Sequence, residues 1–373
     1  MIKKILRKTG VKIIRKAGYS TYTAPKFFDC FVNDLFNLRE VSFKDKIWAY
    51  QRGFFSEQIK RYNLNDSNYK DYLSDFDYMK LQPINKMTGF IDDKLKMRYA
   101  FDKFADYMPK YFYLISYGKV YPLIDTYSDE NKGLSNIFDL VEKEGNLALK
   151  PCSGTGGQGF IKLSYKNKDY FLNNRLKSKK DVEEMLGKLK NYLVTQYLIP
   201  HQDIRKIYEN TPNVIRLVVI NDRENSPQIT AASIRFGTKV TGMIDNSGAG
   251  AVHCGVDIES GRIFNPRITS KNRVVELERH PESNVPIKGL VPHWDFIKTK
   301  VKEICCSFPN LIFVGFDIVV TDKSFKFIEI NSHLGSKFIQ TFYPFMKNEY
   351  SKNFFNELLT KKRLSHKKKI IKI

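Results

Sequence analysis

Two kinds of hydrophobic pattern alternate along this chain from about residue 110 onward. Short runs rich in β-branched and aromatic residues are typical of strands, and segments with apolar residues three or four positions apart are typical of helices. The helical spacing is clear in residues 179–192 and 293–306. The pattern therefore predicts a fold that mixes helices and strands, and it excludes an all-β fold. The strand-like runs are YFYLISYG (111–118), NLALK (146–150), GFIKL (159–163), YLVTQYLI (192–199), NVIRLVVI (213–220), QITAASIRF (228–236), LIFVGFDIVV (311–320) and FKFIEIN (325–331).

The N-terminal part of the chain has a different pattern. Apolar residues recur at helical spacing within residues 2–17, and lysine and arginine fill the other face, which predicts a basic amphipathic helix weakened at Gly10. Such a helix either lies on an anionic membrane or packs its apolar stripe on its own domain, and the pattern allows both. Residues 22–121 are rich in aromatic residues, and most of these are expected in a core. The apolar stripe of the helix consists of Ile2, Ile5, Leu6, Ile13 and Ala17.

Charge narrows the functional classes. The 373 residues include 62 Lys plus Arg against 40 Asp plus Glu, a formal net charge of +22, but 42% are hydrophobic, which is too many for a disordered polycation. Fourteen of the cationic residues lie in residues 1–16 and 361–373, and neither segment contains an acidic residue. A basic nucleic-acid-binding protein is an alternative supported by net charge only. Because no recognition motif accompanies the charge, we do not expect nucleic acid as a partner.

Cysteine and histidine positions indicate neither a zinc site nor a disulfide framework. The five cysteines are an odd number without a C-x-x-C pair, so a reducing cytoplasm is expected. No apolar run approaches the roughly 18 residues of a membrane span, and the N-terminus lacks the apolar stretch of a signal peptide. We therefore expect neither membrane insertion nor export by that route. The six histidines show no metal-ligand spacing and are interpreted as surface or capping residues.

The segment LALKPCSGTGGQGFIKL (147–163) places Lys150 at the end of one strand-like run and a glycine-rich loop before the next. Such a loop can turn backbone N–H groups onto phosphate oxygens, because glycine has no side chain to hold a nucleotide away. The letters contain G-x-G-x-x-G, but a strand-like run follows where a dinucleotide-binding fold needs a helix. A P-loop lacks its closing Lys-Ser or Lys-Thr, and the kinase motifs V-A-I-K, H-R-D and D-F-G do not follow. We therefore expect a β-hairpin flap, with a glycine-rich turn that binds nothing as the alternative.

Two acidic residues face one another in the hairpin predicted over residues 311–331. Carboxylates on opposite strands repel one another unless a cation lies between them. Oxygen ligands without His or Cys suit Mg²⁺ or Mn²⁺, so the hairpin predicts a metal site, with a solvated polar face as the alternative. The expected pairs on the polar side are Thr321 with Phe325, Asp317 with Glu329 and Gly315 with Asn331. The residues expected on the buried side are Phe316, Ile318, Ile328 and Ile330, while Val319 and Phe327 flank the acids.

Several short segments follow one another along the chain in an informative order. They are DDKLKMRYAFDKFADYMP (92–109), LALKPCSGTGGQG (147–159), TQYLIPHQDI (195–204), NVIRLVVI (213–220), AASIRFG (231–237), IDNSGAGAV (244–252), HPES (280–283), VPHWD (291–295), VGFDIVV (314–320) and FIEIN (327–331). In this order, from about residue 85 to 345, they resemble the ATP-grasp superfamily, and within it the sugar-transfer associated ATP-grasp family of bacterial surface-polysaccharide biosynthesis.

That resemblance implies an α+β fold in which two α+β subdomains grip ATP, preceded by a mostly helical, aromatic-rich extension. The implied division is an extension with the basic helix (1–85), a lid subdomain with the glycine-rich flap (86–200), a C-terminal subdomain with the metal hairpin (201–350) and a basic tail (351–373).

The resemblance also implies cofactors and site residues. The cofactors are ATP and Mg²⁺, with two ions expected and Mn²⁺ as an alternative. Arg216 and Arg235 are the implied catalytic residues, because a guanidinium stabilises charge on a transferred phosphoryl group; a structural ion pair is the alternative. The implied metal ligands are Asp317, Glu329 and Asn331, with Glu329 suited to bridge two ions. The implied ATP residues are Lys94 and Lys150 on the phosphates, Ser153, Gly154, Thr155, Gly156, Gly157 and Gln158 in the flap, Gln196, Tyr197 and Leu198 at the adenine, and Asp203 at the ribose; Lys96 and Lys103 are alternatives to Lys94.

The implied function is that of an ATP-dependent carboxylate–amine ligase, which forms a carbon–nitrogen bond through an acyl phosphate and releases ADP. The expected setting is capsule or other surface-polysaccharide assembly. An anionic sugar or lipid-linked saccharide would supply a uronic acid carboxylate, and an amino acid or amino alcohol would supply the amine. A sugar kinase on the same fold is the alternative. The basic tails suggest contact with an anionic membrane at its cytoplasmic face, or with an acidic glycan.

Overall fold

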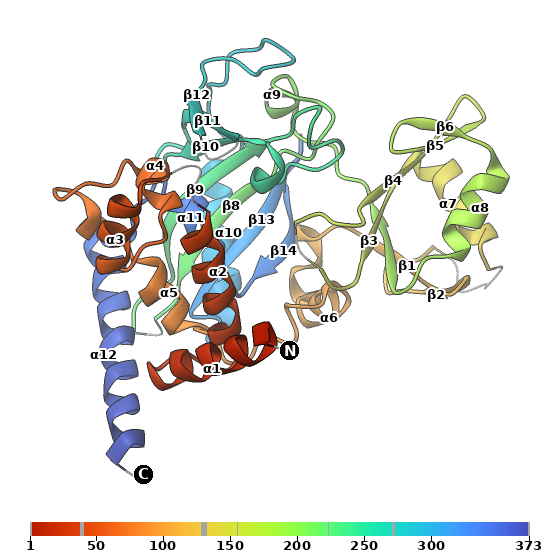
Figure 1. The fold of residues 1–373 in the computed structure, drawn as a ribbon. Helices are drawn as coiled ribbons and strands as arrows, with labels where there is room; N and C mark the ends of the chain where they lie inside the picture. The colour runs from red at the N-terminus through yellow and green to blue at the C-terminus, as the bar shows by residue number, and fades with distance from the viewer. Residues whose placement is uncertain are drawn as a thin grey trace.

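The chain forms two lobes, each built on a seven-stranded antiparallel sheet, with N-terminal helices packed on the second lobe (Figure 1). The computed structural model describes residues 2–37, 41–127, 133–154, 156–222, 224–270 and 273–371. The predicted α+β fold is confirmed.

The first sheet, at the right of Figure 1, has the strand order β2-β1-β7-β3-β4-β5-β6. One face is covered by α7 (Ser135–Glu144) and α8 (Lys179–Gly187), whose apolar residues pack with alternate residues of the strands. Ser178 and Asp181 form a capping box that begins α8. The strands are β1 (Tyr111–Ser116), β2 (Lys119–Pro122), β3 (Asn146–Pro151), β4 (Ile161–Lys166), β5 (Asp169–Leu172), β6 (Arg175–Lys177) and β7 (Tyr192–Gln196).

The second sheet has the order β12-β11-β10-β9-β8-β13-β14, and helices lie on both of its faces. One face packs against α6 (Lys94–Ala100), η2 (Asp102–Tyr107) and α10 (Trp294–Ser307). The other is covered at one end by α5 (Asp75–Leu81), α11 (Ser336–Ile339) and α12 (Glu349–Ile371), and the rest of this face borders the cavity described below. The strands are β8 (Ile215–Ile220), β9 (Gln228–Phe236), β10 (Val252–Val256), β11 (Ile263–Ser270), β12 (Arg273–Glu276), β13 (Phe313–Val320) and β14 (Phe325–Asn331); the short α9 (Gln202–Arg205) and η3 (Ser247–Ala249) lie in loops.

The N-terminal extension is helical, as predicted, and hydrogen bonds attach it to the second lobe. Gln340 bonds both backbone groups of Leu73, and the Tyr78 hydroxyl donates to the carbonyl of Leu334 over 2.6 Å. Asn85 bonds the backbone on either side of the β13 start. The helices are α1 (Ile2–Lys16), α2 (Thr23–Phe36), α3 (Phe43–Gln51), α4 (Glu57–Tyr62), the single turn η1 (Tyr69–Asp71) and α5.

All eight predicted strand runs contain strands, but the pattern missed others. β5, β6 and β12 are short strands at or near a sheet edge, where few apolar positions are needed, and β10 reads VHCGV, which lacks a run of strand-forming residues. The helix predicted over 179–192 ends at Gly187, and the one over 293–306 is α10. No helix in the described ranges is long and apolar enough to cross a membrane. All five cysteines are free thiols.

Candidate active site

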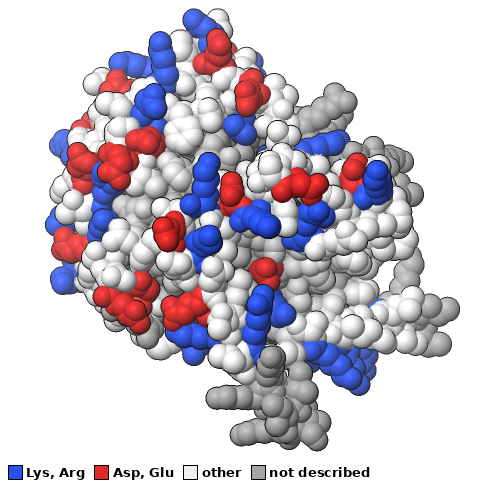
Figure 2. Space-filling model, turned by 90° about the vertical axis from the view of Figure 1, so that its left-hand side faces the viewer, with Lys and Arg blue, Asp and Glu red and all other residues white. Residues whose placement is uncertain are grey.

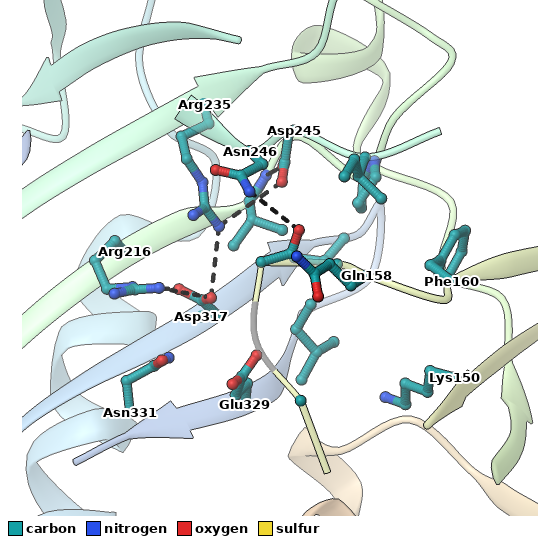
Figure 3. A pocket seen from close by; sticks show the side chains of 18 of the residues that line it. Lys150, Gln158, Phe160, Arg216, Arg235, Asp245, Asn246, Asp317, Glu329 and Asn331 are labelled. Carbon is teal, nitrogen blue, oxygen red and sulfur yellow. Dashed lines mark hydrogen bonds and ion pairs between the residues drawn. The ribbon is translucent and has the colours of Figure 1, made fainter. Parts of the chain in front are cut away.

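A cavity between the two sheets collects nearly all of the residues that the sequence singled out (Figure 3). Its first wall is the end of β3 and the loop that follows; its second is the face of β8, β9, β13 and β14. The lobes meet where the loop touches the second one: the Asn246 amide donates to the carbonyl of Gly156 over 3.1 Å.

The glycine-rich loop joins β3 to β4 as the predicted hairpin, with Leu149 paired to Ile161. Gly154, Gly156, Gly157 and Gly159 all have positive φ, between 69° and 135°, so four backbone positions require the freedom of glycine. A Cβ at Gly157 would lie 2.8 Å from the side chain of Ile244 in the second lobe. The loop is therefore a close-fitting flap over the cavity. Thr155 lies outside the described residues.

Two lysines line the cavity, Lys150 at the end of β3 and Lys94 at the start of α6, and neither forms an ion pair with a described residue. The Lys94 ammonium donates to the carbonyl of Gly154 over 3.1 Å, and Asp93, the N-cap of α6, accepts from the Ser153 hydroxyl. Lys150 lies opposite the metal hairpin, and burial followed by the charge of Lys94 lowers its pKa to about 7. Of the three candidate lysines, Lys94 lines the cavity, whereas Lys96 and Lys103 do not.

The end of β7 and the two residues after it form the apolar end of the cavity. Gln196, Tyr197 and Leu198 line it, and Leu198 is buried against Val214 and Val319. The ammonium of Lys162 lies 4.7 Å from the ring centroid of Tyr197. This end has the flat apolar character that an adenine ring requires.

Asp203 lies apart from this group. It is half-exposed, pairs with Lys206 over 3.0 Å, and is not among the residues that line the cavity. Its expected place at the ribose is therefore not supported by the structure, because its position in α9 directs it to a neighbouring surface lysine.

The metal hairpin is β13 and β14, and its pairs at the site are the predicted ones. Asp317 faces Glu329, and Gly315 faces Asn331. Near the turn, the prediction was wrong by one position: Val320, not Thr321, faces Phe325, and a bulge follows Asp317. The bulge turns Ile328 into the cavity and Phe327 into the opposite core, the reverse of the expected sides.

The donor atoms of this hairpin fit a hard divalent cation. Burial and the neighbouring Asp317 raise the pKa of Glu329, and they outweigh the opposing charges of Lys94, Arg216 and Lys150. Asn331 lines the same cavity, and its side-chain amide oxygen is the atom that could bind such a cation. No group of three or more His, Cys, Asp or Glu side chains suited to a metal occurs in the described part of the chain. The candidate ligands are thus two carboxylates and an amide, the set that Mg²⁺ accepts when phosphate oxygens and water complete its shell.

The arginines occupy neighbouring strands and hold the same carboxylate. Arg216 on β8 binds Asp317 in a bidentate pair through Nε and Nη2, and Arg235 on β9 reaches Asp317 at 3.5 Å and Asp245 at 3.7 Å. Burial alone would raise the pKa of Asp317, but the two arginines outweigh it and lower that pKa. A row of fixed charges therefore crosses the sheet from Glu329 to Arg235 (Figure 3).

Sequence reasoning did not identify His253, which lies beside Arg235 on the neighbouring strand. His253 on β10 faces Arg235 across the strands, lines the cavity, is 7% exposed and makes no hydrogen bond with a described residue. Burial, followed by the charges of nearby arginines, lowers its pKa well below the usual value, so the ring is neutral. Its interpretation as a surface or capping residue is wrong because β10 was not recognised as a strand. Ser233 on β9 also lines the cavity, and its hydroxyl is buried without a described partner.

Of the other histidines, two act as capping residues and one lines the cavity. His201 caps α9, and His280 accepts from two backbone N–H groups, as expected of capping residues. His333 lines the cavity, and its ring lies 5.0 Å from that of Tyr22. Phe338 on α11 completes this end, 5.9 Å from the ring of His253.

Comparison with known proteins gives a family match. The model of the sugar-transfer associated ATP-grasp family matches residues 76–344, about 70% of the chain, which confirms the resemblance carried by the motifs. No protein of curated function matches the chain by sequence.

Solved structures with a similar fold are distant. D-alanine–D-alanine ligase from Bacillus anthracis is 12% identical with a TM-score of 0.37, over 76% of this chain and 70% of that one. D-alanyl-alanine synthetase A from Vibrio cholerae is 13% identical with a TM-score of 0.40, over 74% and 66%. L-amino acid ligase from Bacillus licheniformis is 12% identical with a TM-score of 0.37, and the match spans 76% of this chain but only 47% of that one. These likenesses say nothing about the substrates of this chain.

Proposed function

Because the chain belongs to the sugar-transfer associated ATP-grasp family, which confirms the predicted enzyme class, we propose that it joins a carboxylate to an amine with ATP as the energy source. One observation carries the proposal. Lys94 and Lys150, which form no ion pair with a described residue, line the same cavity as a row of carboxylates and arginines. Phosphate charge and a substrate carboxylate therefore have separate cationic partners in one place.

The first lobe and the start of α6 suit the nucleotide. The apolar pocket of Tyr197 and Leu198 would receive the adenine, and the backbone of residues 196–198 would read its edge. Lys94 and Lys150 would neutralise the phosphates, with the flap closing over them. Lys150 supplies a full positive charge only when protonated, and an anionic ligand favours that form.

Asp317, Glu329 and Asn331 would hold Mg²⁺ or Mn²⁺. Bound there, the metal would shield phosphate charge and polarise the transferred phosphoryl group. The chain's own contribution is to fix these donors on two paired strands, with Asp317 already oriented by two arginines.

The arginines would orient the substrate carboxylate for two successive bond exchanges. In the first, a carboxylate oxygen forms a bond to the γ-phosphorus as the bond from that phosphorus to the bridging oxygen breaks, and ADP leaves. In the second, an amine nitrogen bonds the acyl carbon, the bond between that carbon and the phosphate oxygen breaks, and the amine loses a proton. Arg216 and Arg235 would stabilise the negative charge in both steps.

The cavity extends past the arginines toward the substrate. His253, Ser233 and Phe338 provide a neutral imidazole ring, a hydroxyl without a described partner and an aromatic face, a combination suited to a sugar ring with hydroxyl groups. The N-terminal extension reaches this end, since the guanidinium of Arg61 lies 4.8 Å from the Phe338 ring centroid. We therefore propose a uronic acid, free or lipid-linked, as the carboxylate substrate, an amino acid or amino alcohol as the amine, and surface-polysaccharide assembly as the setting.

The test is direct. The purified protein is incubated with ATP, Mg²⁺, candidate uronic acids and candidate amines, and the products are identified by mass spectrometry. Hydroxylamine in place of the amine should trap an acyl phosphate as the hydroxamate of the acid. A stable phosphorylated sugar, formed with ADP and without an amine, would instead identify a kinase. Absence of ADP formation with every carboxylate offered would refute the ligase proposal.

A further inference from the structure

Helix α1 has two apolar surfaces, of which its own domain covers one. The covered surface lies against α2: a Cβ at Gly10 would lie 2.1 Å from the ring of Phe28, and Arg7 binds Asp29. Gly10, predicted as a weak point of the helix, is thus the position at which α2 approaches most closely. Val11 and Ile14, half-buried, flank the same contact.

The other apolar surface faces solvent. It is the stripe recognised in the sequence: the side chains of Ile5, Leu6 and Ile13 are 56%, 62% and 62% exposed. The packing alternative therefore fails for these three residues. At 100° per residue, Lys4, Lys8, Lys12 and Lys16 form a basic row directly beside this outer stripe. We call Ile5, Leu6, Ile13 and this row the outer face of α1.

The C-terminal helix brings further positive charge to the same end of the molecule. The first half of α12 packs in the core through Phe354, Phe355 and Leu359, while its second half projects from the body on the side where α1 lies (Figure 1). A Cβ at Gly18, just after α1, would lie 3.6 Å from the ring of His366. Two basic segments separated by more than 300 residues in sequence are therefore neighbours.

Charge on one side of the molecule is mixed. The side that carries α3, α4 and α12 has basic and acidic side chains interspersed, while basic side chains are visible at its lower edge, at the level of α1 (Figure 2). The excess positive charge is thus concentrated in the two terminal helices rather than spread over the molecule.

We propose that the outer face of α1, with the adjoining end of α12, docks the protein on a bilayer that contains anionic lipid. The helix lies along the interface, with Ile5, Leu6 and Ile13 inserted among the acyl chains and the lysines at the headgroups. An acidic polysaccharide would attract the same lysines, but a hydrated glycan offers nothing to three exposed aliphatic side chains. The combination of both features on one helix face therefore favours the membrane. Docking would hold the active site beside a lipid-linked acceptor, but it does not depend on the proposed reaction.

The experiment uses the full chain and flotation with vesicles. Vesicles of phosphatidylcholine with phosphatidylglycerol should bind the protein, pure phosphatidylcholine vesicles should not, and added salt should weaken binding. The variant I5S/L6S/I13S should reduce binding by more than about tenfold, because it removes the inserted side chains and leaves every charge in place. A matched control, L176S/V240S/L290S, removes three aliphatic side chains that are 63%, 82% and 61% exposed outside α1, and should bind as the natural protein does.

Circular dichroism and thermal unfolding establish that both variants retain their helices. If I5S/L6S/I13S floats with anionic vesicles as well as the natural protein, the proposal is wrong. It is equally wrong if the natural protein stays with soluble polygalacturonate and never floats with vesicles, because the basic face would then be a glycan-binding surface.

Discussion

The two lobes contribute charge to the cavity in opposite ways. In the first lobe and the adjoining helix α6, Lys150 and Lys94 have no ion pair with a described residue, and burial of Lys150 lowers its pKa to about 7. In the second lobe, Arg216 and Arg235 are fixed by Asp317 and Asp245 on neighbouring strands and a loop. The first arrangement leaves cations available for a ligand that comes and goes. The second holds its charges in a set geometry before any ligand arrives, which limits reorganisation during reaction.

The backbone follows the same division. The flap of the first lobe consists of glycines with positive φ and touches the second lobe at Ile244 and Asn246. The metal hairpin of the second lobe is a pair of hydrogen-bonded strands with helices packed on the face away from the cavity. A phosphate ligand that binds here would therefore contact an adaptable loop on one side and a rigid sheet on the other. The predictions that follow separate these two contributions.

The largest effect is expected from Glu329→Gln, which removes a charge from the rigid side. An amide neither carries the negative charge that attracts a divalent cation nor bridges two ions, so ATP turnover should fall by more than about 100-fold. ADP release measures the loss, and unchanged thermal unfolding shows that the fold persists. The control Asp295→Asn removes a carboxylate that is 91% exposed and should keep full activity. Normal turnover in Glu329→Gln would place the metal elsewhere.

Arg216→Lys tests whether set geometry or charge alone matters in the second lobe. Lysine keeps the charge but cannot form the bidentate pair with Asp317, so kcat should fall by about 100-fold with a smaller change in the KM for ATP. Arg216→Ala leaves Asp317 buried with only the longer contact to Arg235, and should lower the free energy of unfolding by about 3 kcal/mol. Urea unfolding measures this.

Arg7 provides the matched comparison for Arg216. It binds Asp29 with the same bidentate geometry, at 2.8 and 2.7 Å, but both side chains are half-exposed. Arg7→Ala should therefore leave the free energy of unfolding nearly unchanged. Equal destabilisation by the two alanine substitutions would mean that burial does not distinguish these pairs.

Lys150 tests the adaptable side through proton uptake. Its pKa is about 7 without ligand, and bound phosphate should raise that pKa, so ADP binding near pH 8 should take up close to one proton and near pH 6 almost none. Affinity should consequently fall as the pH rises above 7, by at most about tenfold per pH unit. Calorimetry in two buffers with different ionisation enthalpies counts the protons. Lys150→Met should abolish the uptake; if it persists unchanged in that variant, another group titrates.

The smallest effect is expected from Gly157→Ala in the flap. The residue has a φ of +75°, and its added Cβ would lie 2.8 Å from Ile244, so the flap should close less well. The KM for ATP should rise by about five- to tenfold with little change in kcat, as initial rates would show. Gly187→Ala at the end of α8 is the control in the same lobe, because nothing lies within 4 Å of its added Cβ. Similar KM values in the two variants would contradict tight closure of the flap.

The parts of the site that could be predicted from the sequence are those that follow from a local pattern of residues. Asp317 and Glu329 alternate with apolar neighbours on adjoining runs, so their pairing follows from a two-residue period and a short turn. Lys150 and its glycines read as a hairpin because a strand-like run follows them. The same rule failed at Ile328, since a bulge inserts a residue and no local pattern marks it. It failed again at His253, whose strand has no strand-like composition and is formed by pairing with β9 and β11.

Asp245 shows a different limit. It comes from a loop, yet it lies against Arg235 and accepts the N–H of Val214, which is 31 positions away in the sequence. The motif that contains Asp245 was recognised, but no property of the motif by itself indicates these partners.

What the sequence by itself determined was the periodicity of its strands, the glycine flap, the facing carboxylates and the apolar stripe of the first helix, because backbone sterics and side-chain alternation act over a few residues. Only the tertiary structure decided which cations are paired. Asp317 forms ion pairs with two arginines from other strands, while Lys150 forms no ion pair with a described acid. It also decided that the stripe of Ile5, Leu6 and Ile13 faces solvent. The reason is that the surface of α1 that packs on its own domain is the one at Gly10, which fits against Phe28.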